Sequence, residues 1–176
     1  MALEANSRPP VTAFLALGSN LGNSEALLVE AVQAIVAMPN TVLTGKSSLY
    51  VSPAWGTATP QPDYLNAVIS VRTSLTPEAL HQQTAAIEQA HGRARNGEKN
   101  AARTLDIDVL LYGDIALNTD RLTIPHPRMH QRDFVLLPLL EISPDVTIGA
   151  HGSARHLHDL LPVSAIKRLG ETPLWT

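Results

Sequence analysis

The chain has 176 residues, of which 44% are apolar and 16% charged, and its formal net charge is −3. This length suits one domain with a substantial core, and the composition is that of a folded globular protein rather than a disordered one. The negative charge argues against a general nucleic-acid binder, and the absence of cysteine excludes disulfides and thiolate metal sites.

The sequence shows neither a membrane span nor a secretory signal. No apolar run reaches the ~18 residues that a membrane span needs. The first ten residues contain Glu4, Arg8 and two prolines, which is unlike a secretory signal. We therefore expect a cytoplasmic protein without membrane contact, with a flexible tail over residues 1–11 and a single domain over residues 12–176.

The first half of the chain alternates strand and helix patterns. A short apolar run over residues 12–17 predicts a buried strand, and the helix after it ends at Pro39. Residues 42–51 predict a second strand, residues 52–63 a proline-rich loop, and residues 64–73 a strand with clean alternation. Thr76, Pro77 and Glu78 are typical of a helix start, and this helix should run to about His91 and stop at Gly92.

The second half begins with a polar, aperiodic stretch over residues 93–102, which predicts a mobile loop. Strands are expected over residues 104–112 and 122–124, and helices over residues 134–142 and 153–161, with Pro138 near the start of the first helix or at a kink. The order β-α-β-β-α-β predicts an α+β sandwich with one antiparallel sheet and helices packed on it.

Asp106 and Asp108 form the first chemical signal. On a strand their carboxylates point to the same face, about 7 Å apart, while Leu105, Ile107 and Val109 point to the other. Two neighbouring carboxylates repel each other unless a hard cation lies near, and Mg²⁺ binds through one or two carboxylates together with substrate phosphates. A solvent-facing strand edge would also explain the pair.

Basic side chains concentrate on both sides of these acids in the sequence. Six of the ten arginines fall between Arg93 and Arg132, and guanidinium groups suit phosphate better than lysine does. Four cations lie on the 92–103 loop, where they could close over phosphates and expel water. Ordinary solubilising charge is the alternative interpretation.

Two further patterns are less specific. Tyr64 and Asn66 share a strand face, and an aromatic plane beside an amide suits a flat heterocycle, although a packed tyrosine and a capping asparagine would look the same. His126 and His130 have a spacing seen in zinc sites. Pro127 breaks the helix that would align these two histidines, and no cysteine assists, so the sequence argues against zinc.

Together and in this order, these patterns resemble the family of 6-hydroxymethyl-7,8-dihydropterin pyrophosphokinases of folate biosynthesis. The resemblance runs from about Phe14 to Pro144. It rests on the stretches Ala16-Leu17-Gly18-Ser19-Asn20-Leu21-Gly22, Gln61-Pro62-Asp63-Tyr64-Leu65-Asn66 and Leu122-Thr123-Ile124-Pro125-His126-Pro127, and most of all on residues 99–110, KNAARTLDIDVL.

The resemblance implies a ferredoxin-like fold and the transfer of diphosphate from ATP to the pterin alcohol, with AMP leaving. It implies that Asp106 and Asp108 bind two Mg²⁺ ions, and that basic side chains of the catalytic loop clamp the phosphates: Arg93, Arg95, Lys99 and Arg103. ATP-binding positions are Glu88, Arg103, Arg121, Thr123, His126 and Arg132. Pterin-binding positions are Ser52, Pro53, Ala54, Trp55, Tyr64, Asn66 and Phe134, with the rings of Tyr64 and Phe134 on either side of the pterin.

Three positions depart from the family pattern. Lys99 stands where arginine is frequent, so two-pronged phosphate contact is lost there. Asn100 stands where tryptophan is frequent and Ala102 where proline is frequent, and both changes should loosen the loop. The alternatives are an RNA-binding module, which shares this element order, and a nucleotide-binding regulator without turnover. An RNA-binding module would need exposed aromatics in mid-strand and a basic face, whereas this chain has seven aromatics and a net negative charge. We expect small-molecule partners, no nucleic acid, and a monomer, with a dimer left open.

Overall fold

The computed structural model describes residues 8–92 and 102–176. Its main sheet contains the strands β1 (Val11–Ser19), β2 (Thr41–Lys46), β3 (Tyr50–Ser52), β4 (Tyr64–Thr73), β5 (Asp106–Tyr112) and β8 (Lys167–Arg168). The helices are α1 (Ser24–Val36), α2 (Pro77–Ala90), α3 (Asp133–Ile142) and α4 (Ala154–Asp159), and β6 (Leu117–Asn118) pairs with β7 (Thr123–Ile124) in a small separate ribbon.

The sheet has the antiparallel order β5-β1-β4-β3-β8, and β2 pairs with β4 beside β3. With β2 and β3 taken as one interrupted strand, this is the ferredoxin-like arrangement that the family resemblance implied. The predicted α+β class is confirmed. Val11 pairs with Thr73, so β1 begins one residue inside the expected tail.

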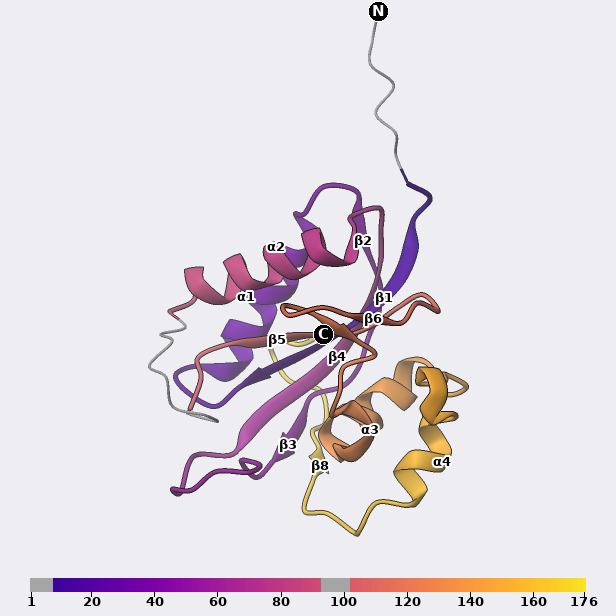
Figure 1. Ribbon diagram of the computed structural model, residues 1–176. Helices are drawn as coiled ribbons and strands as arrows, with labels where there is room; N and C mark the ends of the chain where they lie inside the picture. The colour runs from indigo at the N-terminus through magenta and orange to yellow at the C-terminus, as the bar shows by residue number, and fades with distance from the viewer. Residues whose placement is uncertain (1–7, 93–101) are drawn as a thin grey trace, which may run out of the picture.

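Helices cover both faces of the sheet (Figure 1). On one face α1 and α2 pack on β1, β4 and β5 through a core that includes Leu28, Ile35 and Leu80. On the other face α3 packs on β4 through Val135, Leu136 and Leu139, and α4 packs beside α3. The alternation of β4 follows this division, because Ala67, Ile69 and Val71 belong to the first core and Val68 to the second.

The helix starts follow the predicted capping chemistry. Asn23 accepts a hydrogen bond from the N–H of Ala26 at the start of α1, and Thr76 accepts one from Ala79 at the start of α2, where Pro77 is the first helical residue. The helix α2 ends at Ala90, two residues before Gly92, which has a φ of +80°. Pro138 lies inside α3.

The single strand expected over residues 42–51 is wrong, because β2 ends at Lys46 and β3 begins at Tyr50. The register of β2 against β4 already shifts between Leu43 and Gly45. At Ser47 the side-chain Oγ, instead of a backbone carbonyl, accepts the hydrogen bond from the N–H of Val68 on β4. The N–H of Ser48 turns out of the sheet to the carboxylate of Glu141 on α3, so the strand is interrupted there.

Candidate active site

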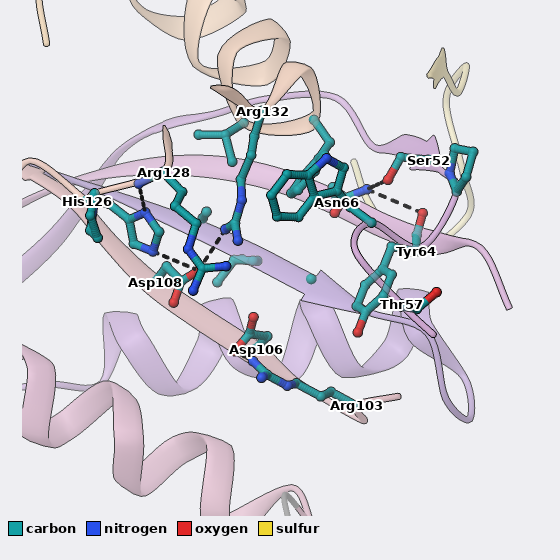
Figure 2. A pocket seen from close by; sticks show the side chains of 18 residues that line it. Ser52, Thr57, Tyr64, Asn66, Arg103, Asp106, Asp108, His126, Arg128 and Arg132 are labelled. Atoms are coloured by element: carbon teal, nitrogen blue, oxygen red, sulfur yellow. Dashed lines mark hydrogen bonds and ion pairs between the residues drawn. The ribbon is translucent and has the colours of Figure 1, made fainter. Parts of the chain in front are cut away.

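One cavity lies on the α3 face of the sheet, over the ends of β1, β4 and β5 (Figure 2). Its lining combines acidic, basic and aromatic side chains from five segments of the chain. They are Ala16, Leu17, Gly18, Ser52, Pro53, Trp55, Thr57, Tyr64, Asn66, Arg103, Asp106, Asp108, His126, Pro127, Arg128, Arg132, Phe134 and Val135.

Asp106 and Asp108 form the acidic end of this cavity. Ile107 and Val109 of the same strand point into the core under α1 and α2, so the two carboxylates emerge on the opposite face, as the alternation of β5 requires. Burial, and then the neighbouring Asp106 carboxylate, raise the pKa of Asp108 to about 7, although Arg132 opposes this shift. This shift indicates that the nearby arginines do not fully compensate the negative charge of the two carboxylates.

Basic groups surround the acids on two sides. Nη1 of Arg103 donates a hydrogen bond to Oδ1 of Asp106 at 2.8 Å, and Nη1 of Arg132 lies 4.0 Å from Oδ2 of Asp108. Burial alone would lower the pKa of Arg103, but Asp106, together with Tyr64 and Asp108, raises that pKa above its ordinary value. Arg103 is therefore firmly paired, whereas Arg132 is only loosely attached to an acid.

His126 approaches Asp108 from the segment after β7. Its backbone N–H donates to the carbonyl of Leu110 at 2.9 Å, which ties this segment to the acid-bearing strand. Burial, and then Arg132 and Arg128, lower the pKa of His126 to about 4, so the ring is neutral near pH 7. Nδ1 accepts a hydrogen bond from the N–H of Arg128, which puts the proton on Nε2, 3.6 Å from Oδ2 of Asp108.

The aromatic end of the cavity lies on β3 and β4. The side chain of Asn66 is buried, and its Nδ2 donates to Oγ of Ser52 at 2.8 Å and to the carbonyls of Tyr50 and Tyr64 at 3.3 Å. These bonds fix the amide orientation, so Oδ1 is the atom turned away from β3. Phe134 enters the same cavity from the start of α3.

Asn20 connects the segments on either side of the cavity. Its Oδ1 accepts from the N–H of Arg103, and its Nδ2 donates to the carbonyl of Pro62 and to Oε1 of Gln61. Asn20 is 4% exposed, so these bonds are shielded from water. This gives the turn after Gly18 a structural role, because it joins the start of the acidic segment to the loop before Tyr64.

The structure brings together most of the residues that the sequence proposed. Five of the proposed catalytic and ATP-binding residues line the cavity: Arg103, Asp106, Asp108, His126 and Arg132. From the pterin set it brings in Ser52, Pro53, Trp55, Tyr64, Asn66 and Phe134. Arg93, Arg95 and Lys99 lie outside the described residues.

Four proposed residues are not part of the described lining. Arg121 is exposed beyond β6, the Oγ1 of Thr123 donates to Asn118, and Ala54 lies next to lining residues without being one. Glu88 is buried on α2, and its Oε1 accepts from the N–H of Ile107 at 2.7 Å. Glu88 thus holds the strand at the residue between the two acids, beneath the cavity.

Some lining residues were not among the proposed site residues. They are Ala16, Leu17, Gly18, Thr57, Pro127, Arg128 and Val135. Arg128 could have been found from the sequence, because it belongs to the arginine cluster and lies two residues after the proposed ATP-binding residue His126. Thr57 lies in a proline-rich loop without periodicity, so nothing in the pattern could have selected it.

The fold and cavity define a class: a ferredoxin-like α+β protein with acidic, basic and aromatic groups joined on one face of its sheet. A model of the family 7,8-dihydro-6-hydroxymethylpterin-pyrophosphokinase (HPPK) matches residues 14–144. The chain belongs to this family.

Named relatives agree with this assignment. The chain is 44% identical over 138 residues to the 2-amino-4-hydroxy-6-hydroxymethyldihydropteridine pyrophosphokinase of Haemophilus influenzae, covering 78% of this chain and 85% of the relative. It is 40% identical over 157 residues to the enzyme of that name from Methylorubrum extorquens, covering 89% and 98%.

A solved structure is also similar. A Plasmodium falciparum HPPK-DHPS triple mutant with STZ-DHP matches with a TM-score of 0.69 at 14% identity, covering 88% of this chain and 44% of that one. The chain therefore spans less than half of that protein, and at this identity the likeness supports the fold alone.

Proposed function

We propose that this chain transfers diphosphate from ATP to 6-hydroxymethyl-7,8-dihydropterin, a step of folate biosynthesis. The hydroxymethyl oxygen attacks the β-phosphorus, the bond from that phosphorus to the oxygen bridging the α-phosphate breaks, and AMP leaves. The hydroxyl proton is released, and the other product is the pterin diphosphate. Family membership and the names of the relatives support this reaction.

One cross-strand row carries the proposal. Gly18 on β1 pairs with Asp106 on β5 at one side and with Asn66 on β4 at the other. Adjacent strands are about 4.8 Å apart, so the acid and the amide are separated by about 10 Å across a residue without a side chain. A heterocycle at Asn66 would then present its hydroxymethyl group toward phosphates held at Asp106.

The acidic end fits Mg²⁺, and we propose that Asp106 and Asp108 bind two ions. The raised pKa of Asp108 arises from burial and from a second carboxylate, the situation that a hard cation relieves. Mg²⁺ in such a site neutralises phosphate charge and orients the donor. Arg103 and Arg132 would meet the phosphates from two sides, and neutral His126 would offer its Nε2–H beside Asp108.

Arg93, Arg95 and Lys99, which lie outside the described residues, are proposed to add their cations to this clamp. We further propose that Arg121 and Thr123 reach ATP from the β6–β7 ribbon. We propose that Glu88 supports the site from the opposite face of the sheet. Its carboxylate accepts a hydrogen bond from the N–H of Ile107, the residue between the two acids, and so holds β5 in place. Positioning of this kind can lower a barrier by about 7–11 kcal/mol without a general base, and none is proposed here.

At the other end, the pterin is proposed to lie between the rings of Tyr64 and Phe134. Oδ1 of Asn66 would accept from its donor edge, since Nδ2 is already committed to Ser52 and to two carbonyls. Pro53, Ala54 and Trp55 would complete that side. An RNA-binding module is less well supported, because α1 and α2 cover one face of the described sheet and α3 the other.

We also propose one catalytic domain over residues 12–176, acting as a monomer in the cytoplasm. No helix in the part of the chain that the structure describes is long and apolar enough to cross a membrane.

The deciding experiment mixes the protein with ATP, Mg²⁺ and the reduced pterin alcohol, and identifies the nucleotide product by chromatography. AMP should form in step with the pterin diphosphate, and chelation of Mg²⁺ should stop it. Formation of ADP, or AMP production that does not require the pterin, would contradict the proposal.

A further inference from the structure

The guanidinium group of Arg132 lies close to two aromatic rings at the rim of the cavity. Its Cζ is 5.2 Å from the ring centroid of Trp55 and 5.5 Å from that of Phe134. Both distances are within the range in which a cation is attracted to an aromatic face. The side chain of Arg132 is only 14% exposed, so water screens these contacts weakly.

The polar contacts of Arg132 are weak by comparison. Its Nη1 is 4.0 Å from Asp108, at the outer limit of an ion pair and too far for a hydrogen bond. Its Nε is buried, and no group in the described residues accepts a hydrogen bond from it. Burial lowers the pKa of Arg132. Because these polar contacts are weak, the rings of Trp55 and Phe134 are the contacts that can fix the orientation of this guanidinium group.

The two rings differ in what else holds them. Phe134 belongs to α3 and packs against the core under that helix. Trp55 lies in the loop between β3 and β4 and is 45% exposed, so its indole contributes little to the core. Trp55 also lines the cavity, so its contact with Arg132 lies at the candidate site rather than in a core.

We infer that Trp55 is a positioning residue for Arg132, whose guanidinium group it holds over Asp108 ready for the phosphates of ATP. The inference rests on the proposed function, because Arg132 is taken as an ATP-binding residue. It assigns the loop between β3 and β4 a second role. Besides meeting the pterin, this loop organises the phosphate side of the cavity.

The test measures the affinity of the 176-residue chain for Mg·ATP by calorimetry without the pterin, so that it does not depend on turnover. Trp55→Phe keeps an aromatic face, Trp55→Leu keeps apolar bulk without one, and Trp55→Ala removes both. We expect the Phe variant to bind within about twofold of the wild type. We expect the Leu and Ala variants to bind about three- to tenfold more weakly.

A double-mutant cycle identifies the residue through which Trp55 acts. In an Arg132→Ala background, Trp55→Ala should change the Mg·ATP affinity by less than about 1.5-fold, because the partner is gone. Val163→Ala, at a fully exposed position, is the matched control and should bind as the wild type does. Thermal unfolding of each variant checks that the fold is kept.

Three results would overturn the inference. One is wild-type affinity in the Leu variant, another is an equal loss with and without Arg132, and the third is a rise in the KM for the pterin with no change in Mg·ATP affinity. Failure of the proposed function would look different. The wild type would make no AMP, while the pattern of ATP affinities could still hold.

Discussion

Gly18 faces Asn66 across β1 and β4, and a methyl group on Gly18 would lie 3.6 Å from both Oδ1 of Asn66 and Cδ1 of Tyr64. These are ordinary contact distances, so Gly18→Ala should fold. The methyl group would nevertheless cover the one amide atom that the Asn66 network leaves for a ligand. We expect the KM for the pterin to rise about tenfold, the scale of one misplaced methyl group in a pocket.

Gly170→Ala is the matched control for this prediction, because a methyl group there would meet nothing within 4 Å. Steady-state kinetics with each substrate varied in turn separates the two ends of the cavity. The KM for ATP should stay within about twofold in both variants. An unchanged KM for the pterin in Gly18→Ala would show that the heterocycle does not lie against this row.

The acidic pair should be indispensable for turnover. Asp106→Ala and Asp108→Ala each remove a carboxylate that lies on the surface of the cavity rather than in a core, so folded proteins are expected. Turnover should fall by at least ~10³-fold, the usual scale when electrostatic stabilisation of a transferring group is lost. AMP production measured at saturating substrates checks this, with circular dichroism to confirm folding.

Asp114→Ala provides the comparison, since this exposed aspartate follows β5 and does not line the cavity. It should turn over at the wild-type rate. Near-normal AMP production by either Asp106→Ala or Asp108→Ala would refute the assignment of Mg²⁺ to these acids.

Local patterns predicted the elements that hold the site. The strand over residues 64–73 and the helix from Pro77 were found at their observed starts, because alternation and capping are properties of neighbouring residues. The placement of Asp106 and Asp108 on one face followed from the same alternation. The grouping of remote residues such as Tyr64 and Phe134 came from a resemblance to a known family, and alternation alone could not have supplied it.

What the sequence could not predict depends on contacts between distant segments. The break at Ser47 arises because its side chain bonds Val68 and because Glu141 draws away the N–H of Ser48. The pairing of β8 with β3 joins residues more than a hundred positions apart, and two-residue strands have no periodicity to detect. Glu88 was proposed as an ATP contact. Its hydrogen bond to the N–H of Ile107 could not be predicted, because it depends on how α2 packs against β5.

Glu141 joins α3 to the edge of the sheet and should make stability depend on pH. Its carboxylate accepts from the N–H and Oγ of Ser48 and from the phenol of Tyr50, and Arg168 lies 3.1 Å away. Burial alone would raise the pKa of Glu141, but the bonds from Ser48 and Tyr50, helped by Arg168, lower it below its ordinary value.

A carboxyl group whose pKa is lower in the folded state stabilises the fold above its unfolded pKa, and this stabilisation is lost as the pH falls through the folded value. Glu141→Gln should therefore lower the free energy of unfolding at pH 7 by about 1 kcal/mol. The difference from the wild type should shrink as the pH falls below about 4.5. Urea titrations at several pH values measure it, with exposed Glu171→Gln as the control. A difference that grows in acid would contradict the assigned pKa direction.

Trp175 anchors the C-terminal segment, which lies beyond the residues that the family model matches. The indole is 7% exposed and joins the core under α1, and its Nε1–H donates to the carbonyl of Ser47 at 2.8 Å. Glu25 on α1 accepts the backbone N–H groups of Leu174 and Trp175, and the ammonium of Lys46 lies over the ring. One aromatic side chain thus ties the last residues to α1 and to the interrupted strand before β3.

Trp175→Ala should lower the free energy of unfolding by about 3–5 kcal/mol, because it removes a buried aromatic side chain and leaves the Ser47 carbonyl without its partner. Trp175→Phe keeps most of the buried surface and loses only the hydrogen bond, so a loss of about 1 kcal/mol is expected. Urea unfolding followed by circular dichroism compares the two. If Trp175→Ala were as stable as Trp175→Phe, the indole would not contribute to the folded core, and the anchoring role assigned to it would be wrong.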